Sequence, residues 1–90
     1  MTQELDAELE AHLRDVVLRT VGADVLVDLR IKPYVDYNDE DALRFTLVLR
    51  EDRFDQIDRI TVMSNLVDAL RARRLDLFPY TTLLTDREAA

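Results

Sequence analysis

The densest group of side chains that could do chemistry is a run of oxygen donors near the middle of the chain: Asp36, Asn38, Asp39, Glu40 and Asp41. Such donors suit Ca²⁺ or Mg²⁺. An EF-hand loop beginning at Asp36 would need glycine at its sixth position and glutamate at its twelfth, where this chain has Asp41 and Leu47. The EF-hand pattern is absent. The run therefore favours a solvated hairpin connection, with weak cation binding and recognition of a basic partner as alternatives.

The chain has few side chains that could supply imidazole or thiol chemistry. His12 is the only histidine, and the chain has no cysteine. A zinc site would have to draw on carboxylates, and general acid–base catalysis by His12 would need an oriented partner that the sequence does not single out. The only glycine, Gly22, leaves no glycine-rich phosphate-binding loop. We therefore predict no enzyme activity, no metal site and no cofactor.

Arginines form the only basic cluster, at positions 71, 73 and 74. Arg71, Arg73 and Arg74 could clamp a phosphate or a carboxylate. Near the end of an expected helix they would also compensate the helix dipole and pair with acids such as Asp68 and Asp76. We favour this structural interpretation, because phosphate binding normally needs a larger basic surface.

A second candidate for recognition is the uncharged segment from Phe78 to Thr82. It could be an edge to which another chain adds a strand. It could also close the core, with Phe78, Tyr80 and Leu84 turned toward the helices. We favour the core, because a hairpin needs a third strand for stability. The candidate partner-binding residues are Asp36, Asp39, Glu40, Asp41, Arg71, Arg73, Arg74 and Tyr80.

The longest expected apolar helix runs from Asp55 to Arg74, and the other elements are expected to cover it. At 100° per residue, its apolar side chains spread over roughly two-thirds of the circumference. They are Ile57, Ile60, Val62, Met63, Leu66, Val67, Ala69 and Leu70. Asp52 or Asp55 is expected to start this helix. The breadth predicts contact on more than one side, by a sheet and by either a second helix or a partner chain.

The remaining elements follow from periodicity. A first helix is expected from Thr2 to about Thr20, with Gly22 as a left-handed C-terminal cap. Alternation of apolar and polar residues predicts strands over 24–32 and 43–50, joined as an antiparallel hairpin. Pro33 is expected to end the pairing or to lie at an edge. A last, short strand is expected at about 78–85, and residues 86–90 are expected to form a loose or weakly helical tail.

The order helix-strand-strand-helix-strand predicts an α+β, two-layer sandwich. A right-handed crossover through the second helix would place the last strand parallel to a strand of the hairpin. Both helices would then cover one face of a three-stranded mixed sheet, within a single domain over residues 1–90. The opposite face would be a solvent or dimer surface. It is expected to show Leu26, Arg30, Arg44 and Val48, with Tyr34 or Tyr80 as further members.

Charge and hydropathy restrict the partners. The net charge is -7, from 19 acidic and 12 basic residues, and the first 45 residues carry 11 of the acids. This charge disfavours nucleic acid and anionic membranes. No apolar run approaches the roughly 18–20 residues that span a bilayer, and the N-terminus is unlike a signal peptide. We therefore expect a cytoplasmic protein. Eleven of the basic residues are arginine, which suggests a bacterial genome rich in GC.

The element order is similar to that of type II KH domains and of BolA-like proteins. The first resemblance implies RNA binding through a Gly-x-x-Gly loop, and the second implies iron-cluster or glutaredoxin partnership through a histidine late in the chain. This chain has only Gly22 and His12 for those roles, both in its first half. The resemblance is therefore one of topology, which does not by itself imply function.

The sequence thus favours a small acidic, non-enzymatic protein-interaction module, such as an adaptor, a regulator or an antitoxin-like protein. Its partner is expected to be another protein or a second copy of the chain in a homodimer. The alternative is a KH- or BolA-like module that binds nucleic acid or a small ligand through the arginine-bearing face of the sheet.

Overall fold

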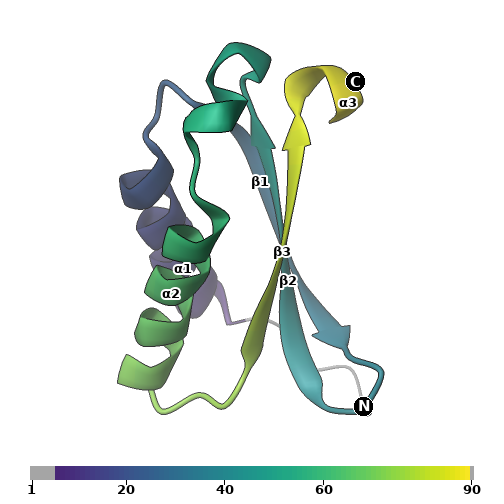
Figure 1. The fold of residues 1–90 in the computed structure, drawn as a ribbon. Coiled ribbons are helices and arrows are strands. Elements are labelled where there is room, and N and C mark those ends of the chain that lie inside the picture. The colour runs from purple at the N-terminus through teal and green to yellow at the C-terminus, as the bar shows by residue number, and fades with distance from the viewer. Residues whose placement is uncertain (1–5, 90) are drawn as a thin grey trace.

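The computed structural model describes residues 6–89 and has the predicted α+β architecture (Figure 1). Its elements are α1 (Ala7–Val21), β1 (Leu26–Val35), β2 (Asp41–Leu49), the 3₁₀-helix η1 (Glu51–Gln56), α2 (Arg59–Ala72), β3 (Phe78–Thr85) and α3 (Asp86–Ala89). β2 is the central strand, antiparallel to β1 and parallel to β3. Helices α1 and α2 lie side by side on one face of this mixed sheet. The predicted element order and two-layer arrangement are confirmed.

Helix α1 buries one narrow stripe. Its core-facing residues are Leu9, Leu13, Val17 and Val21. The N-cap is Asp6, whose carboxylate accepts a hydrogen bond from the Glu8 N–H. At the other end Gly22 has φ 101° and ψ 141°, so its φ is positive as predicted, in an extended region that is essentially restricted to glycine. The predicted start at Thr2 lies outside the described residues.

Strand β1 departs from simple alternation at one position. A β-bulge between Leu26 and Asp28 leaves Val27 opposite no residue of β2. Val27 is therefore 54% exposed, although alternation with Leu29 predicts burial, and Leu26 packs against the core instead of appearing on the opposite face as predicted. Pro33 lies within the strand rather than at its end, which an edge strand tolerates.

The second helix is shorter than predicted. Residues 51–56 form η1, and α2 begins at Arg59 after the N-cap Asp58, so neither Asp52 nor Asp55 starts it. Its fully buried residues form one stripe, Val62, Leu66 and Leu70. Ile60 is 77% exposed. The predicted contact on more than one side is confirmed, because α2 packs against both α1 and β3. Full burial is narrower than the apolar surface: it follows four-residue spacing, and Met63, Val67 and Ala69 are only partly covered.

Residues 86–89 form the short helix α3, which is the weakly helical alternative predicted for this segment. Thr85 and Glu88 form a reciprocal capping box, in which the Thr85 N–H donates to Glu88 Oε1 and the Glu88 N–H donates to Thr85 Oγ1, at 3.0 and 3.1 Å. Arg87 adds an ion pair to Glu51 at 3.8 Å. Helix α3 turns away from the layer formed by α1 and α2 (Figure 1).

The hydrophobic core lies between the sheet and the two longer helices. Alternate residues of the central strand enter it: Leu43, Phe45, Leu47 and Leu49. Phe45 and Leu66 are both completely buried. Within residues 6–89, no helix combines the length and apolar character that crossing a bilayer requires.

Candidate interaction surface

No long helix covers the sheet face that points away from α1 and α2, and we call it the open sheet face (Figure 1). Paired residues of neighbouring strands point to the same side, so the register assigns its members. They are Asp28, Arg30, Lys32 and Tyr34 from β1, Ala42, Arg44, Thr46 and Val48 from β2, and Phe78, Tyr80, Thr82 and Leu84 from β3.

This assignment corrects the prediction for β3. Parallel pairing places Phe78 beside Ala42, Tyr80 beside Arg44 and Leu84 beside Val48, all on the open sheet face. The favoured interpretation of the sequence had turned all three side chains toward the helices, although Tyr80 had also been named as a possible member of the opposite face. Phe78 and Leu84 are therefore corrected, and Tyr80 lies on the face that the second expectation gave it. Both sets of alternate residues in this strand contain apolar members, so alternation alone could not choose the buried face, and the pairing with β2 decides it.

Three aromatic residues gather at one end of the open sheet face, and we call them the aromatic cluster: Tyr34, Phe78 and Tyr80. The Tyr80 ring packs edge-on against Tyr34 and Phe78, with centroid distances of 5.4 and 4.7 Å. The guanidinium carbon of Arg44 lies 4.6 Å from the Tyr34 ring centroid. Phe78 remains 48% exposed. The cluster is thus ordered by its own contacts and still presents apolar surface to solvent.

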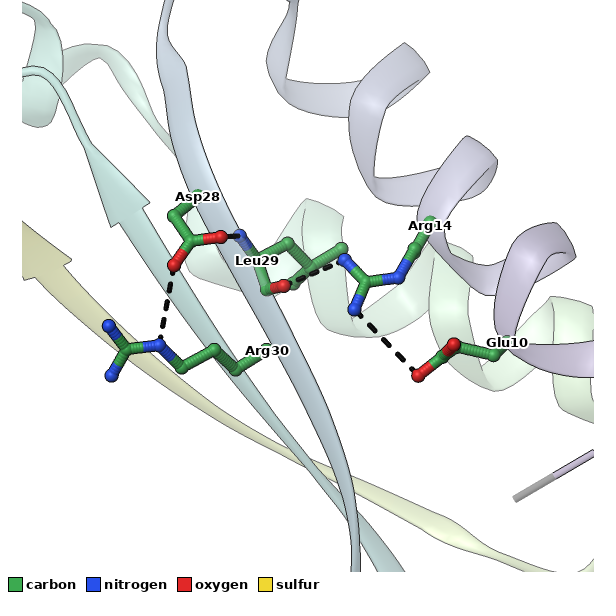
Figure 2. Close-up of polar contacts among 5 residues, drawn as sticks. All are labelled: Glu10, Arg14, Asp28, Leu29 and Arg30. Carbon is green, nitrogen blue, oxygen red and sulfur yellow. Dashed lines mark hydrogen bonds and ion pairs between the residues drawn. The ribbon is translucent and has the colours of Figure 1, made fainter. Parts of the chain in front are cut away.

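The positive charges of the open sheet face lie beside this cluster. Arg30, Lys32 and Arg44 occupy neighbouring positions, because Lys32 pairs with Arg44 across β1 and β2. Among the strand residues assigned to this face the only acid is Asp28, which accepts a hydrogen bond from Arg30 Nε at 3.3 Å (Figure 2). Asp36 of the adjoining turn reaches the edge of the face at Tyr80. An acidic protein therefore carries a locally basic surface on its sheet.

Asp36 is the one member of the acidic run that the structure joins to the aromatic cluster. Its Oδ1 accepts from the N–H groups of Asn38 and Glu40 at 2.8 and 3.0 Å, and its Oδ2 accepts from the Tyr80 hydroxyl at 3.2 Å. The Glu40 N–H is the main cause that holds the pKa of Asp36 below its ordinary value. Desolvation, followed by the Asp36 charge, raises the pKa of Tyr80.

The rest of the acidic run shapes the hairpin turn. Asp39 has φ 59°, in the left-handed region, and its N–H donates to the Asp36 carbonyl oxygen. Asp39, Glu40 and Asp41 are all exposed. Among residues 6–89 no three acidic, histidine or cysteine side chains come together in a group suited to a metal ion. The run forms the connection between β1 and β2, as its composition favoured, and recognition of a basic partner by it stays a prediction.

The predicted arginine cluster lies elsewhere, at the end of α2. Arg73 pairs with Glu8 of α1 at 3.5 Å, and not with Asp68 or Asp76 as had been expected. Arg74 has φ 59° and follows the last helical turn, where its N–H donates to the Arg71 carbonyl oxygen. A hollow of about 130 Å³ beside Arg71 is lined by α2, the connection that follows it and the start of β3. These arginines are not on the open sheet face.

The structure therefore separates the predicted site residues into two groups. Tyr80 and Asp36 meet at the aromatic cluster, whereas Arg71, Arg73 and Arg74 end α2. Prediction from sequence placed Arg44 with Tyr34 or Tyr80 on the face opposite the helices, as the structure has them, but did not add Phe78. Register between β1, β2 and β3 was the missing information. His12 lies half-buried on α1, away from the sheet face.

Comparison with known proteins found no relative of this chain. No family model matches the chain, and neither a curated protein nor a solved structure does. Function must therefore be argued from the surface itself.

Proposed function

We propose that the chain is a non-enzymatic protein-interaction domain that binds its partner through the open sheet face. The observation that carries this proposal is the grouping of Tyr34, Phe78 and Tyr80 with Arg44 stacked on Tyr34. Tyrosine and arginine dominate the binding energy of protein interfaces, where rigid rings contribute area at low entropic cost. Adaptor, regulator and antitoxin-like roles all fit such a domain, and we place it in the cytoplasm.

Charge defines the chemistry of the proposed partner. Arg30, Lys32 and Arg44 outnumber the acids Asp28 and Asp36 at the open sheet face, so the complementary surface is an acidic patch with apolar residues at its centre. Because those cations are exposed, their attraction to acids is screened by salt. Binding through this face should therefore weaken as ionic strength rises.

A matched pair of charge reversals tests the proposal. Arg44→Glu changes the open sheet face, whereas Arg59→Glu makes the same change at the exposed start of α2. A protein captured from extract by the wild-type chain should be retained by Arg59→Glu and lost by Arg44→Glu. With the purified partner, Arg44→Glu should weaken binding by ~10-fold or more, as expected for an interfacial charge. Equal capture by both variants would refute the assignment.

Single-stranded nucleic acid is the alternative occupant of the same face. Aromatic rings on a sheet can stack on bases while nearby cations contact phosphates, and the stacking of Arg44 on Tyr34 suits that role. The net charge of -7 opposes it, so we rank it second. Fluorescence anisotropy with a labelled single-stranded oligonucleotide at low salt separates the two. If the oligonucleotide binds tightly and Arg44→Glu abolishes that binding, the partner of the open sheet face is nucleic acid rather than a protein.

A further inference from the structure

The two edges of the sheet differ in how their backbone groups are protected. Strands at an edge expose unpaired N–H and C=O groups, which proteins usually block with charges, bulges, proline or covering side chains. β1 and β3 are the two edge strands. They can therefore be compared for their capacity to accept another strand.

The edge at β1 is blocked in several ways. Arg14 of α1 donates to the Leu29 carbonyl oxygen at 2.7 Å, and the Leu29 N–H donates to Asp28 Oδ1 at 2.8 Å, so side chains occupy both backbone groups (Figure 2). Glu10 lies 3.7 Å from Arg14 and supports it. The bulge at Val27 and the proline at 33 interrupt the same edge. An added strand would meet few free donors there.

The edge at β3 is protected only toward its two ends. Pro79 has no N–H and its carbonyl oxygen accepts from the Thr81 hydroxyl, and at the other end the Thr85 N–H donates to Glu88. None of the eight residues Phe78–Thr85 is charged, in a chain of which 34% is charged. Within residues 6–89, no strand pairs with its outer side. Leu83 and Leu84 are partly exposed, whereas their neighbours Leu47 and Val48 in the central strand are 0% and 2% exposed. A strand placed beside β3 would bury these leucines.

The direction of the backbone N–H and C=O groups limits which residues of β3 can bond to an added strand. Pro79 has no N–H, and the Thr85 N–H donates to the Glu88 side chain rather than to β2. Successive backbone groups in a strand point alternately to its two sides. The free groups at the outer edge are therefore those of Thr81 and Leu83, between the proline and the capped end.

We propose that β3 pairs with β3 of a second copy of this chain, antiparallel about a two-fold axis at Thr82, to form a sheet continuous across a homodimer. In this register each Thr81 exchanges both backbone hydrogen bonds with Leu83 of the partner subunit, and Tyr80 lies opposite the partner's Leu84. No charged side chains oppose one another within the paired segment, whereas self-pairing of β1 would bring Arg30 and Lys32 close to their copies. A two-fold axis at Thr81 would instead set Pro79 against Leu83, with one donor missing.

The net charge of the chain predicts how salt affects the homodimer. Each copy carries -7, so two copies repel one another and salt should strengthen the dimer. Binding of an acidic partner by the open sheet face has the opposite dependence. The dimer uses the backbone edge of β3, which borders the open sheet face at Tyr80, Thr82 and Leu84. It does not rest on the proposed function, and the opposite salt dependences distinguish the failure of one from the failure of the other.

Light scattering across a concentration series tests the dimer. The wild-type mass should approach twice 10.5 kDa at high concentration and fall toward 10.5 kDa on dilution. Thr82→Lys places like charges at the two-fold axis and should remove the dimer. Val27→Lys adds the same charge to the exposed bulge of β1 and should leave it intact. Circular dichroism and the melting temperature of each variant check that the subunit is folded.

Mixing two variants of Thr82 tests whether the two-fold axis of the dimer lies at this residue. Thr82→Lys and Thr82→Glu should each be monomeric, and an equimolar mixture should recover a mass near twice 10.5 kDa. A wild-type monomer at every concentration would overturn the proposal. A dimer that survives Thr82→Lys, or a mixture of the two folded variants that stays monomeric, would overturn it equally, because the contact would then lie elsewhere.

Discussion

The Tyr80 hydroxyl donates a hydrogen bond to Asp36 Oδ2 at 3.2 Å and so connects β3 to the turn between β1 and β2. The two residues are far apart in the chain, and each changes the proton affinity of the other. The bond helps to lower the pKa of Asp36 and to raise that of Tyr80. It also orients the ring at the centre of the aromatic cluster.

The pKa of Asp36 should depend on Tyr80. Tyr80→Phe removes one donor, so the pKa of Asp36 should rise, while the N–H groups of Glu40 and Asn38 keep it below 3.8. NMR of the carboxyl carbon against pH measures this shift. Tyr37→Phe, at an exposed ring, is the control. An Asp36 pKa that Tyr80→Phe leaves unchanged would mean that the bond is not formed in solution.

The same group predicts the direction of an acid transition. Because the folded pKa of Asp36 lies below its ordinary value of 3.8, Asp36 stabilises the fold at pH values above 3.8. That contribution is lost as the pH falls through the folded pKa. The melting temperature of Asp36→Ala should therefore lie below that of the wild-type chain at neutral pH, and the difference should shrink in acid. A difference that grows in acid would contradict this assignment.

Leu66 should be a major contributor to stability. It is completely buried on α2, and Leu66→Ala should lower the free energy of unfolding by about 2–5 kcal/mol. Ile60→Ala removes a side chain that is 77% exposed on the same helix, and its effect should stay within about 0.5 kcal/mol. Chemical denaturation measures both variants. Similar losses for the two would mean that the exposed surface of α2 is covered in solution.

Asp58 should determine where α2 begins. Its two carboxylate oxygens accept from the Ile60 N–H at 3.0 Å and from the Thr61 hydroxyl at 2.9 Å. Asp58→Ala should cost about 0.5–2 kcal/mol, because a helix N-cap is lost. Asp55→Ala, at another exposed acid, which lies within η1, is the matched control and should change stability little. Equal effects in denaturation would assign the loss to charge rather than to capping.

Replacing Arg74 by glycine should stabilise the fold. It has φ 59°, and the N–H of the next residue, Leu75, donates to the Leu70 carbonyl oxygen in a Schellman arrangement that favours glycine. Arg74→Gly should raise the free energy of unfolding by about 0.5–1 kcal/mol, since relief of left-handed strain exceeds the added freedom of the unfolded chain. Gly22→Ala should act in the opposite direction, because Gly22 has φ 101° and a Cβ would lie 3.0 Å from Asp24 Oδ1. Denaturation of both variants checks the pair, and a loss of stability in Arg74→Gly would contradict the assignment.

Local patterns were enough to predict the two long helices, the three strands and their order, but not the 3₁₀-helix η1. The spacing of Leu9, Leu13 and Val17 defined one helix, and alternation from Leu43 to Leu49 defined the central strand. Gly22 marked a helix end because its positive φ is costly for other residues. These signals act within a few residues, so periodicity and short-range sterics carry them.

Only the tertiary structure decided how those elements combine into surfaces. Which face Phe78 and Tyr80 occupy depends on the register with β2, and a strand whose two faces are both partly apolar does not encode that choice. The bulge at Val27 likewise follows from pairing with β2. The aromatic cluster joins residues from β1 and β3, and the contrast between the two sheet edges depends on Arg14 reaching Leu29 across the fold. Sequence alone therefore determined the local elements and the charge, while long-range pairing created the surfaces from which function is proposed.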